Sequence, residues 1–270
     1  MSGVLSAPRG VSGRRRAILD YVTMQGPVSV AALGERFVVN RISLSRDLQM
    51  LVAQGLLRKV GNAVTAWPSG VSAGSVMYRL DQAVRQKAAI AGMAASMIRP
   101  GDTVALDDST TVRFLADHLE ELGSLTVITN SLGLGMMAGR LQDVTLIGLG
   151  GHYSTAFDAF AGVLCERSLA TLRIDTLFMS AGAIHGTAAY HQDEDLIKIK
   201  TAMMRQADWR VLMVDSRKFG ISVLNRLADL SEFDVVITDD GISPEQVERL
   251  ASAGVALRIA TVSHAERAAT

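Results

Sequence analysis

Residues 28–57 read VSVAALGERFVVNRISLSRDLQMLVAQGLL, and this stretch predicts two short helices joined by a tight turn. Ser29 can cap the first helix and Asn40 the second, because their side-chain oxygens can accept a hydrogen bond from a free backbone N–H group. The second helix has a core-facing apolar stripe at one- and two-turn spacing, formed by Leu44, Leu48, Leu51 and Val52. The pattern is that of a helix-turn-helix, and a preceding helix is expected from Arg14 to Met24.

The face opposite the stripe has side chains suited to a DNA major groove. Arg46 could donate two hydrogen bonds to a guanine, and Ile42 could contact a thymine methyl group. Basic side chains at Arg14–Arg16, Arg41, Arg58 and Lys59 would contact phosphates and position the helix. The candidate DNA-binding residues are Arg41, Ile42, Ser43, Ser45, Arg46, Gln49, Arg58 and Lys59. A three-helix bundle that binds protein or only dimerises is the alternative.

Charge is distributed unevenly along the chain. Residues 1–62 hold nine Lys and Arg but three Asp and Glu, whereas the remainder holds 18 and 24, respectively. A basic first part and an acidic second part suit a phosphate-bearing partner at one end only. The single cysteine, Cys165, excludes an internal disulfide and is expected to be buried in a reducing compartment. No stretch has the length of a membrane span, so we expect a cytoplasmic protein with no membrane partner.

The composition divides the chain into five parts. We expect a frayed segment at 1–13, a winged helix-turn-helix at 14–64, a linker at 65–80, an α/β domain at 81–262 and a tail at 263–270. Within the α/β domain the expected strands are Thr103–Leu106, Leu125–Ile128, Val144–Ile147, Thr176–Met179, Val211–Val214, Val235–Thr238 and Val255–Ile259. The expected helices are Gln82–Met97, Thr111–Glu121, Leu132–Arg140, Glu194–Ala207 and Pro244–Ala253.

Polar or glycine-rich loops follow several of these strands. The first runs from Asp107 to Thr111, and Thr129–Ser131, Gly148–His152, Ser180–Ala183 and Asp215–Gly220 follow later strands. Each loop alone is weak evidence, because glycine after a strand and Ser or Thr before a helix are usually turn and cap residues. Ligands of such sheets bind outside the carboxyl ends of the strands. The recurrence of these loops at one end therefore predicts a pocket for an anionic polyol.

These residues resemble DeoR-family bacterial transcription regulators over roughly residues 14–260. The resemblance rests on the helix-turn-helix quoted above and on the sensor markers at 106–111, 129–131, 150–151, 175–178 and 215–220. It implies an α/β fold similar to ribose-phosphate isomerases and CoA-transferases, with a phosphorylated sugar or related metabolite as effector. The chain departs from the family pattern at Ser45, at the wing (61–64), and at Asp108-Ser109, where the family has Ser-Gly. The extra carboxylate favours an unphosphorylated sugar or polyol as an alternative effector.

The resemblance also assigns roles by position. Thr110 and Thr111 would hold an anion, Lys218 would supply the counter-charge, and Asp107 or Asn130 would bind sugar hydroxyls. The full set of candidate effector-binding residues is Asp107, Asp108, Ser109, Thr110, Thr111, Asn130, Gly150, Gly151 and Lys218. Lys198 or Lys200 could also line the pocket, but the favoured interpretation is that both are solvated, as helix-surface lysines usually are.

The sequence thus favours a metabolite-responsive repressor of carbohydrate-metabolism genes that binds operator DNA as a homodimer or homotetramer. The rival is a sugar-phosphate isomerase with a nucleic-acid tether, in which Asp107-Asp108 or Asp239-Asp240 could supply a general base. We expect no catalytic residue and no cofactor, because binding energy alone can operate a switch attached to a DNA reader. We expect no metal site, because His152, His185 and His191 lack a metal-binding spacing.

Overall fold

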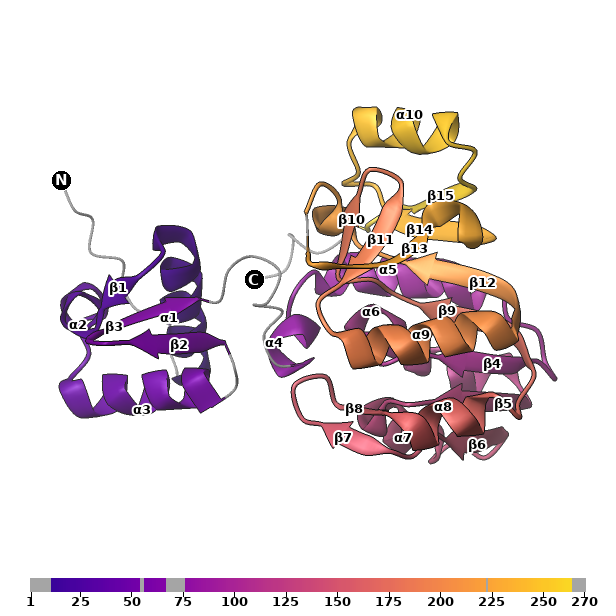
Figure 1. Cartoon of the computed structure of the whole chain (residues 1–270), viewed down its shortest axis with the longest axis horizontal. Helices are drawn as coiled ribbons and strands as arrows, with labels where there is room; N and C mark the ends of the chain where they lie inside the picture. The colour runs from indigo at the N-terminus through magenta and orange to yellow at the C-terminus, as the bar shows by residue number, and fades with distance from the viewer. Residues whose placement is uncertain (1–10, 54–55, 67–75, 222, 264–270) are drawn as a thin grey trace. The chain divides into compact units, whose positions relative to one another are not determined.

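The chain folds into two compact units, residues 1–75 and 76–270, and each is described by itself. The computed structural model describes residues 11–53, 56–66, 76–221 and 223–263 (Figure 1). The expected tail at 263–270 therefore lies almost wholly outside the described residues. The first helix begins at Val11, inside the segment expected to fray, and β3 and α4 occupy the two ends of the expected linker. No helix of the described residues is long and apolar enough to cross a membrane.

The amino-terminal unit is a winged helix-turn-helix. Its elements are α1 (Val11–Gln25), β1 (Val28–Ser29), α2 (Val30–Phe37), α3 (Arg41–Ala53), β2 (Leu57–Val60) and β3 (Ala63–Ala66). The strands form a sheet in the order β1-β3-β2, and Gly61, at φ +58°, turns the chain between β2 and β3. The residue pattern of 28–57 thus predicts both helices, and the wing that follows them was implied by the family resemblance.

Local capping explains where the two short helices begin. The Ser29 hydroxyl accepts a hydrogen bond from the Ala32 N–H at 3.1 Å, and the Asn40 side chain accepts one from the Ser43 N–H at 2.8 Å. Leu44, Leu48 and Leu51 are buried as expected, but Val52 is 38% exposed. The prediction for Val52 was wrong because its angular position, at about 100° per residue, lies at the edge of the stripe.

The carboxy-terminal unit is built on a seven-stranded parallel sheet in the order β15-β14-β12-β9-β4-β5-β6. In that order the strands are Leu257–Ala260, Val235–Asp239, Ala207–Met213, Ile174–Met179, Thr103–Leu106, Leu125–Thr129 and Val144–Gly148. All seven expected strands are present. Apolar side chains that alternate along the strands supply two cores, one on each face of the sheet.

Helices cover both faces of this sheet. Figure 1 shows α8 (Val163–Leu169) and α9 (Glu194–Gln206) in front of it and α5 (Val84–Ala95) behind it. The remaining helices are α4 (Val76–Leu80), α6 (Thr110–Arg113), α7 (Leu132–Ala138) and α10 (Pro244–Ser252). The helix expected at Thr111–Glu121 is instead the single turn α6 followed by two 3-10 segments, η1 (Phe114–Asp117) and η2 (Leu119–Leu122). Cys165 is buried in α8, as expected.

Two smaller sheets were not predicted. One is formed by β10 (Ala183–His185), β11 (Ala188–His191) and β13 (Asn225–Asp229), and the other by β7 (His152–Ser154) and β8 (Ala159–Ala161). Two further 3-10 turns, η3 (Ser216–Lys218) and η4 (Leu230–Glu232), lie beside β12 and β13 in sequence. These strands of three to five residues are too short to give a clear alternating pattern in the sequence.

Candidate DNA-reading and effector sites

Helix α3 presents its polar face to solvent. Arg41, Ser45, Arg46 and Gln49 are exposed, and so is Ile42, at 69%. Because Leu44, Leu48 and Leu51 hold the opposite face in the core, the helix is fixed with its candidate base-reading side chains outward. Ser43 is only partly buried, and its N–H group is engaged by the cap. Arg58 and Lys59 lie exposed on β2, at the expected wing.

The arginine cluster of α1 has a structural role that the sequence reading missed. Arg14 and Arg15 each donate to the carboxylate of Asp47, at 2.7 Å, and Asp47 is 1% exposed. This pairing attaches α1 to α3. Arg16 is exposed, whereas Arg14 and Arg15 share the single negative charge of Asp47.

The sheet of the carboxy-terminal unit reverses its direction of growth between β4 and β9. From β4 the chain adds β5 and β6 on one side, and β9, β12, β14 and β15 follow on the other. Such a reversal opens a crevice at the carboxyl ends of the two central strands. The loop that begins at Asp107 follows β4 and the loop that begins at Ser180 follows β9, so both predicted loops border this crevice.

Asp107 connects the two loops. Its carboxylate accepts hydrogen bonds from the Ser109 N–H and the Ser180 N–H, each at 2.9 Å, and it is fully buried. Lys200 of α9 donates to the same carboxylate and lies 3.3 Å from Asp108 Oδ1. Burial alone would lower the pKa of Lys200, but the two carboxylates raise it. With three protein donors already bound, Asp107 holds the crevice together.

Two other lysines at this end of the sheet make hydrogen bonds to uncharged oxygens. Lys87 of α5 donates to Thr110 Oγ1 at 2.9 Å and to the carbonyl of Arg79. Lys218 donates to the Ala181 carbonyl at 2.7 Å and to the Ser180 hydroxyl at 3.3 Å. Neither lysine has a carboxylate within ion-pair distance among the described residues, so neither amine has an ion-pair partner there when it is protonated.

The pKa values of these lysines reflect that environment. Burial lowers the pKa of Lys87 to about 7, and the positive charge of Lys218 contributes to the shift. Burial lowers the pKa of Lys218 to about 8, with Asp215 acting in the opposite direction. Desolvation and like-charge repulsion disfavour the protonated amines, and a bound anion would relieve both effects.

Several polar atoms around the crevice are buried without a hydrogen-bond partner among the described residues. They include Thr111 Oγ1 and Asn130 Oδ1. The Asn130 amide group is oriented by its bond from Nδ2 to the Phe160 carbonyl, at 3.0 Å. Since unpaired buried acceptors are rare in native proteins, these atoms are suited to a ligand that brings hydroxyl donors.

The other predicted effector residues divide between the crevice and its surroundings. Asp108, Ser109 and Thr110 are buried with Asp107, and Ser109 caps α6 through its bond from the Val112 N–H at 3.2 Å. Gly150 instead lines a neighbouring cavity of about 410 Å³, between α7 and β6. Gly151 packs against β8, where a Cβ atom would lie 2.4 Å from the Ala161 carbonyl oxygen.

The histidines singled out in the sequence differ in burial. His191 is buried, its Nδ1 accepts from the Asp193 N–H at 3.2 Å, and burial lowers its pKa to about 3. His152 and His185 are exposed. No group of three or more possible ligands for a metal ion is found among the described residues.

Sequence reasoning missed Lys87, and its preference for a solvated Lys200 over a pocket position was wrong. Lys200 is 1% exposed, whereas Lys198 is exposed and pairs with Asp195 at 2.8 Å. The sequence signal that could have identified Lys87 and Lys200 as buried is their position on the apolar face of a helix. Lys200 lies one turn from the buried residues Leu196, Met203 and Met204, and Lys87 shares its stripe with Ile90, Ala91 and Ala94. A lysine on the apolar side of a helix is therefore a better pocket candidate than its residue type suggests.

Comparison with known families covers both units. The DeoR-like helix-turn-helix domain matches residues 14–67, and the DeoR C terminal sensor domain matches residues 82–240. The chain belongs to the DeoR family. As a DeoR-family transcription regulator it is a DNA-binding protein, which confirms the resemblance and the fold class drawn from the sequence.

Curated relatives of this DeoR-family chain span nearly its whole length. It is 34% identical over 236 residues to the "uncharacterized HTH-type transcriptional regulator YgbI" of Escherichia coli K12, covering 87% of this chain and 92% of the relative. It is 28% identical to the "putative aga operon transcriptional repressor" of Escherichia coli O157:H7, covering 91% and 93%. It is also 28% identical to the "lactose phosphotransferase system repressor" of Lactococcus lactis, covering 87% and 93%.

Solved structures are more distant. The ribose 5-phosphate isomerase A of Methanocaldococcus jannaschii is 17% identical, with a TM-score of 0.36 over 49% of this chain and 53% of that one. The translation initiation factor eIF-2B of Pyrococcus horikoshii OT3 is 12% identical, with a TM-score of 0.42 over 87% and 90%. The curated relatives described above are named as regulators, not as enzymes.

Proposed function

We propose that this DeoR-family regulator represses carbohydrate-metabolism genes and is released from its operator by a small anionic polyol, most simply a phosphorylated sugar. The observation that carries the proposal is the pair of lysines, Lys87 and Lys218, whose amines lie at the crevice between β4 and β9 with hydrogen bonds only to uncharged oxygens. A phosphate there would receive charge-assisted hydrogen bonds from both amines. The hydroxyl groups of Thr110 and Ser180, which accept from these lysines, could donate to the phosphate as well.

The hydroxyl end of the effector would bind the unpaired acceptors. Asn130 Oδ1 and Thr111 Oγ1 are the proposed contacts, and Asp107 keeps the two loops in place. Asp108 supports the second candidate, an unphosphorylated sugar or polyol, because its buried carboxylate would repel phosphate unless Lys200 neutralises it. The names of the lactose phosphotransferase repressor, the aga operon repressor and the L-fucose operon activator also favour carbohydrate operons, with either sign of regulation.

On the DNA side, α3 would enter the major groove. Arg46, Ile42 and Gln49 would contact base edges, and Arg41, Ser45, Arg58 and Lys59 would contact bases or phosphates from the helix and wing. One reader offers a small contact area, so the active form would be a homodimer or homotetramer that places readers on neighbouring half-sites. Such a protein acts beside the chromosome, in the bacterial cytoplasm.

The switch requires that the effector binds the weak DNA-binding state more tightly than the strong one. A coupling free energy of about 1–3 kcal/mol, or roughly 5–150-fold in affinity, is typical of such regulators. The test is DNA binding by fluorescence anisotropy, with a fragment from the promoter beside the coding sequence and a panel of matched sugars and sugar phosphates. We expect a sugar phosphate to weaken DNA binding where its unphosphorylated partner does not.

Lys218→Gln provides the matched variant. It should bind the promoter fragment as the wild type does but need a much higher sugar phosphate concentration for release, because one of two phosphate contacts is lost. Lys198→Gln, an exposed lysine on α9, is the control and should respond normally. Equal responses to each sugar and its phosphate would eliminate the phosphate assignment, and an unchanged Lys218→Gln would remove Lys218 from the pocket.

A further inference from the structure

A second cavity lies at the opposite end of the sheet from the crevice. It has a volume of about 500 Å³ and forms where the chain beyond α5 meets the beginnings of β9, β12 and β14. This volume is in the range that small ligands occupy. Since β12 has seven residues, and a strand rises about 3.3 Å per residue, the cavity and the crevice lie roughly 20 Å apart along the sheet. Neither the proposed effector nor the DNA-reading role uses it.

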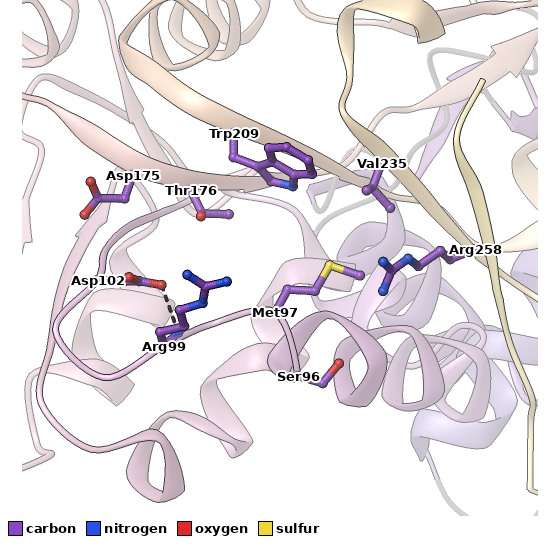
Figure 2. A pocket seen from close by; sticks show the side chains of 9 residues that line it. All are labelled: Ser96, Met97, Arg99, Asp102, Asp175, Thr176, Trp209, Val235 and Arg258. Carbon is purple, nitrogen blue, oxygen red and sulfur yellow. Dashed lines mark hydrogen bonds between the residues drawn. The ribbon is translucent and has the colours of Figure 1, made fainter. Parts of the chain in front are cut away.

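The walls of this cavity include two side chains suited to a flat ring. Trp209 is 47% exposed, although tryptophan in a strand is usually covered. β12 pairs in parallel with β9, which places Trp209 beside Thr176. The indole ring therefore lines the cavity from a position on the sheet. Figure 2 shows the thioether of Met97 on the other side of the cavity from the indole. An aromatic ring between them would gain both stacking and sulfur–aromatic contacts.

The charged side chains lie toward two ends of the cavity. Figure 2 shows Asp102, Asp175 and the Arg99 guanidinium, which lies beside Asp102, at one end, and Arg258 at the other. Among the described residues, neither arginine lies within ion-pair distance of a carboxylate. One oxygen of Asp102 accepts the Arg99 N–H at 2.8 Å, which leaves the other oxygen available.

We propose that this cavity binds a nucleoside monophosphate. The base lies between Trp209 and Met97, the phosphate pairs with Arg258, and a base N–H donates to Asp102. A nucleotide fits because it carries an anion and hydrogen-bond donors on opposite sides of a flat ring. A simple phosphate would leave the ring site and the carboxylate end unused, and would be repelled by Asp102 and Asp175.

The test is isothermal titration calorimetry on the full chain with AMP, GMP, adenosine and inorganic phosphate. We expect AMP or GMP to bind saturably, and adenosine and inorganic phosphate to bind at least about tenfold more weakly. Arg258→Gln and Trp209→Ala should each weaken nucleotide binding by about tenfold or more. Both side chains are exposed, so both variants should fold, which thermal unfolding checks. Arg140 is exposed and is not among the residues that line this cavity, so the control variant Arg140→Gln should bind nucleotide as the wild type does.

Three results would overturn the proposal. One is the lack of saturable binding of both nucleotides at millimolar concentration. Another is nucleotide binding that falls in Lys218→Gln but not in Arg258→Gln, because that would place the nucleotide in the crevice. The third is a change of oligomeric state in Trp209→Ala with unchanged nucleotide affinity, because that would make this surface a contact between copies of the chain.

Discussion

Replacing Asp107 with asparagine tests the central feature of the effector crevice, the carboxylate that joins the loops after β4 and β9. Three donors meet this carboxylate, from Ser109, Ser180 and Lys200, and it is fully buried. Asparagine keeps the shape but removes the charge, and it directs an N–H group toward a donor. One donor is then left unsatisfied, and Lys200 keeps only Asp108 as a counter-charge.

The expected loss follows from these contacts. Breaking a buried ion pair by removing one partner costs about 3–5 kcal/mol. Because Asp108 remains 3.3 Å from the ammonium of Lys200, we expect the lower half of that range, about 3–4 kcal/mol. For a unit of this size, each kcal/mol lowers the unfolding temperature by roughly 2–4 °C, so the shift should be about 6–16 °C.

Differential scanning calorimetry of the full chain measures this shift in the transition of the carboxy-terminal unit. Asp195→Asn breaks the exposed pair with Lys198 and should change stability by less than about 0.5 kcal/mol. Combining Asp107→Asn with Lys200→Met removes the stranded charge, so the double variant should be more stable than the sum of the single losses indicates. A loss below about 1 kcal/mol in Asp107→Asn would refute the reasoning.

Three further predictions concern the reader and the lysines. Arg46→Ala should lower operator affinity by about 1–3 kcal/mol in an anisotropy titration, whereas the control Arg140→Ala should not. Equal operator affinities of the two variants would exclude Arg46 as a DNA contact. Asp47→Ala removes the acceptor of two arginines and should lower the stability of the reader by about 1–3 kcal/mol in urea unfolding, and an unchanged midpoint would contradict its role in joining α1 to α3. Protonated Lys87 and Lys218, with pKa values of about 7 and about 8, attract anions, so effector affinity should fall as pH rises from 6 to 9. Both lysines bind protons more weakly in the folded state than in the unfolded state, so the free energy of unfolding should rise with pH above about 7. An effector affinity that does not change with pH would exclude these lysines as the anion site.

Much of the fold follows from local sequence patterns. Ser29 and Asn40 cap the helices that the sequence predicts, and the apolar runs predict all seven strands of the parallel sheet. Short strands such as β10 and β11 were missed because three or four residues carry little periodicity. The helix expected after Asp107 was too long, because the chain from Phe114 onward continues in 3-10 turns.

The crevice was predictable only in part. Polar loops at strand ends placed Asp107 and Lys218 near one another, because parallel strands share a carboxyl edge. The sequence could not assign their partners, since contacts such as Lys200 with Asp107 join residues 93 positions apart. It likewise treated Arg14 and Arg15 as phosphate contacts, whereas the packing of α1 on α3 directs them to Asp47.

The sequence by itself determined the elements, the helix-turn-helix and the edge of the sheet at which the polar loops gather, because capping and periodicity are local properties of the chain. Only the tertiary structure decided which charges are neutralised. It buries Lys200 between two carboxylates and leaves Lys87 and Lys218 bound to uncharged oxygens. The physical reason is that the free energy of a charge depends on its burial and on the neighbours that packing brings to it, and neither is a property of the residue alone.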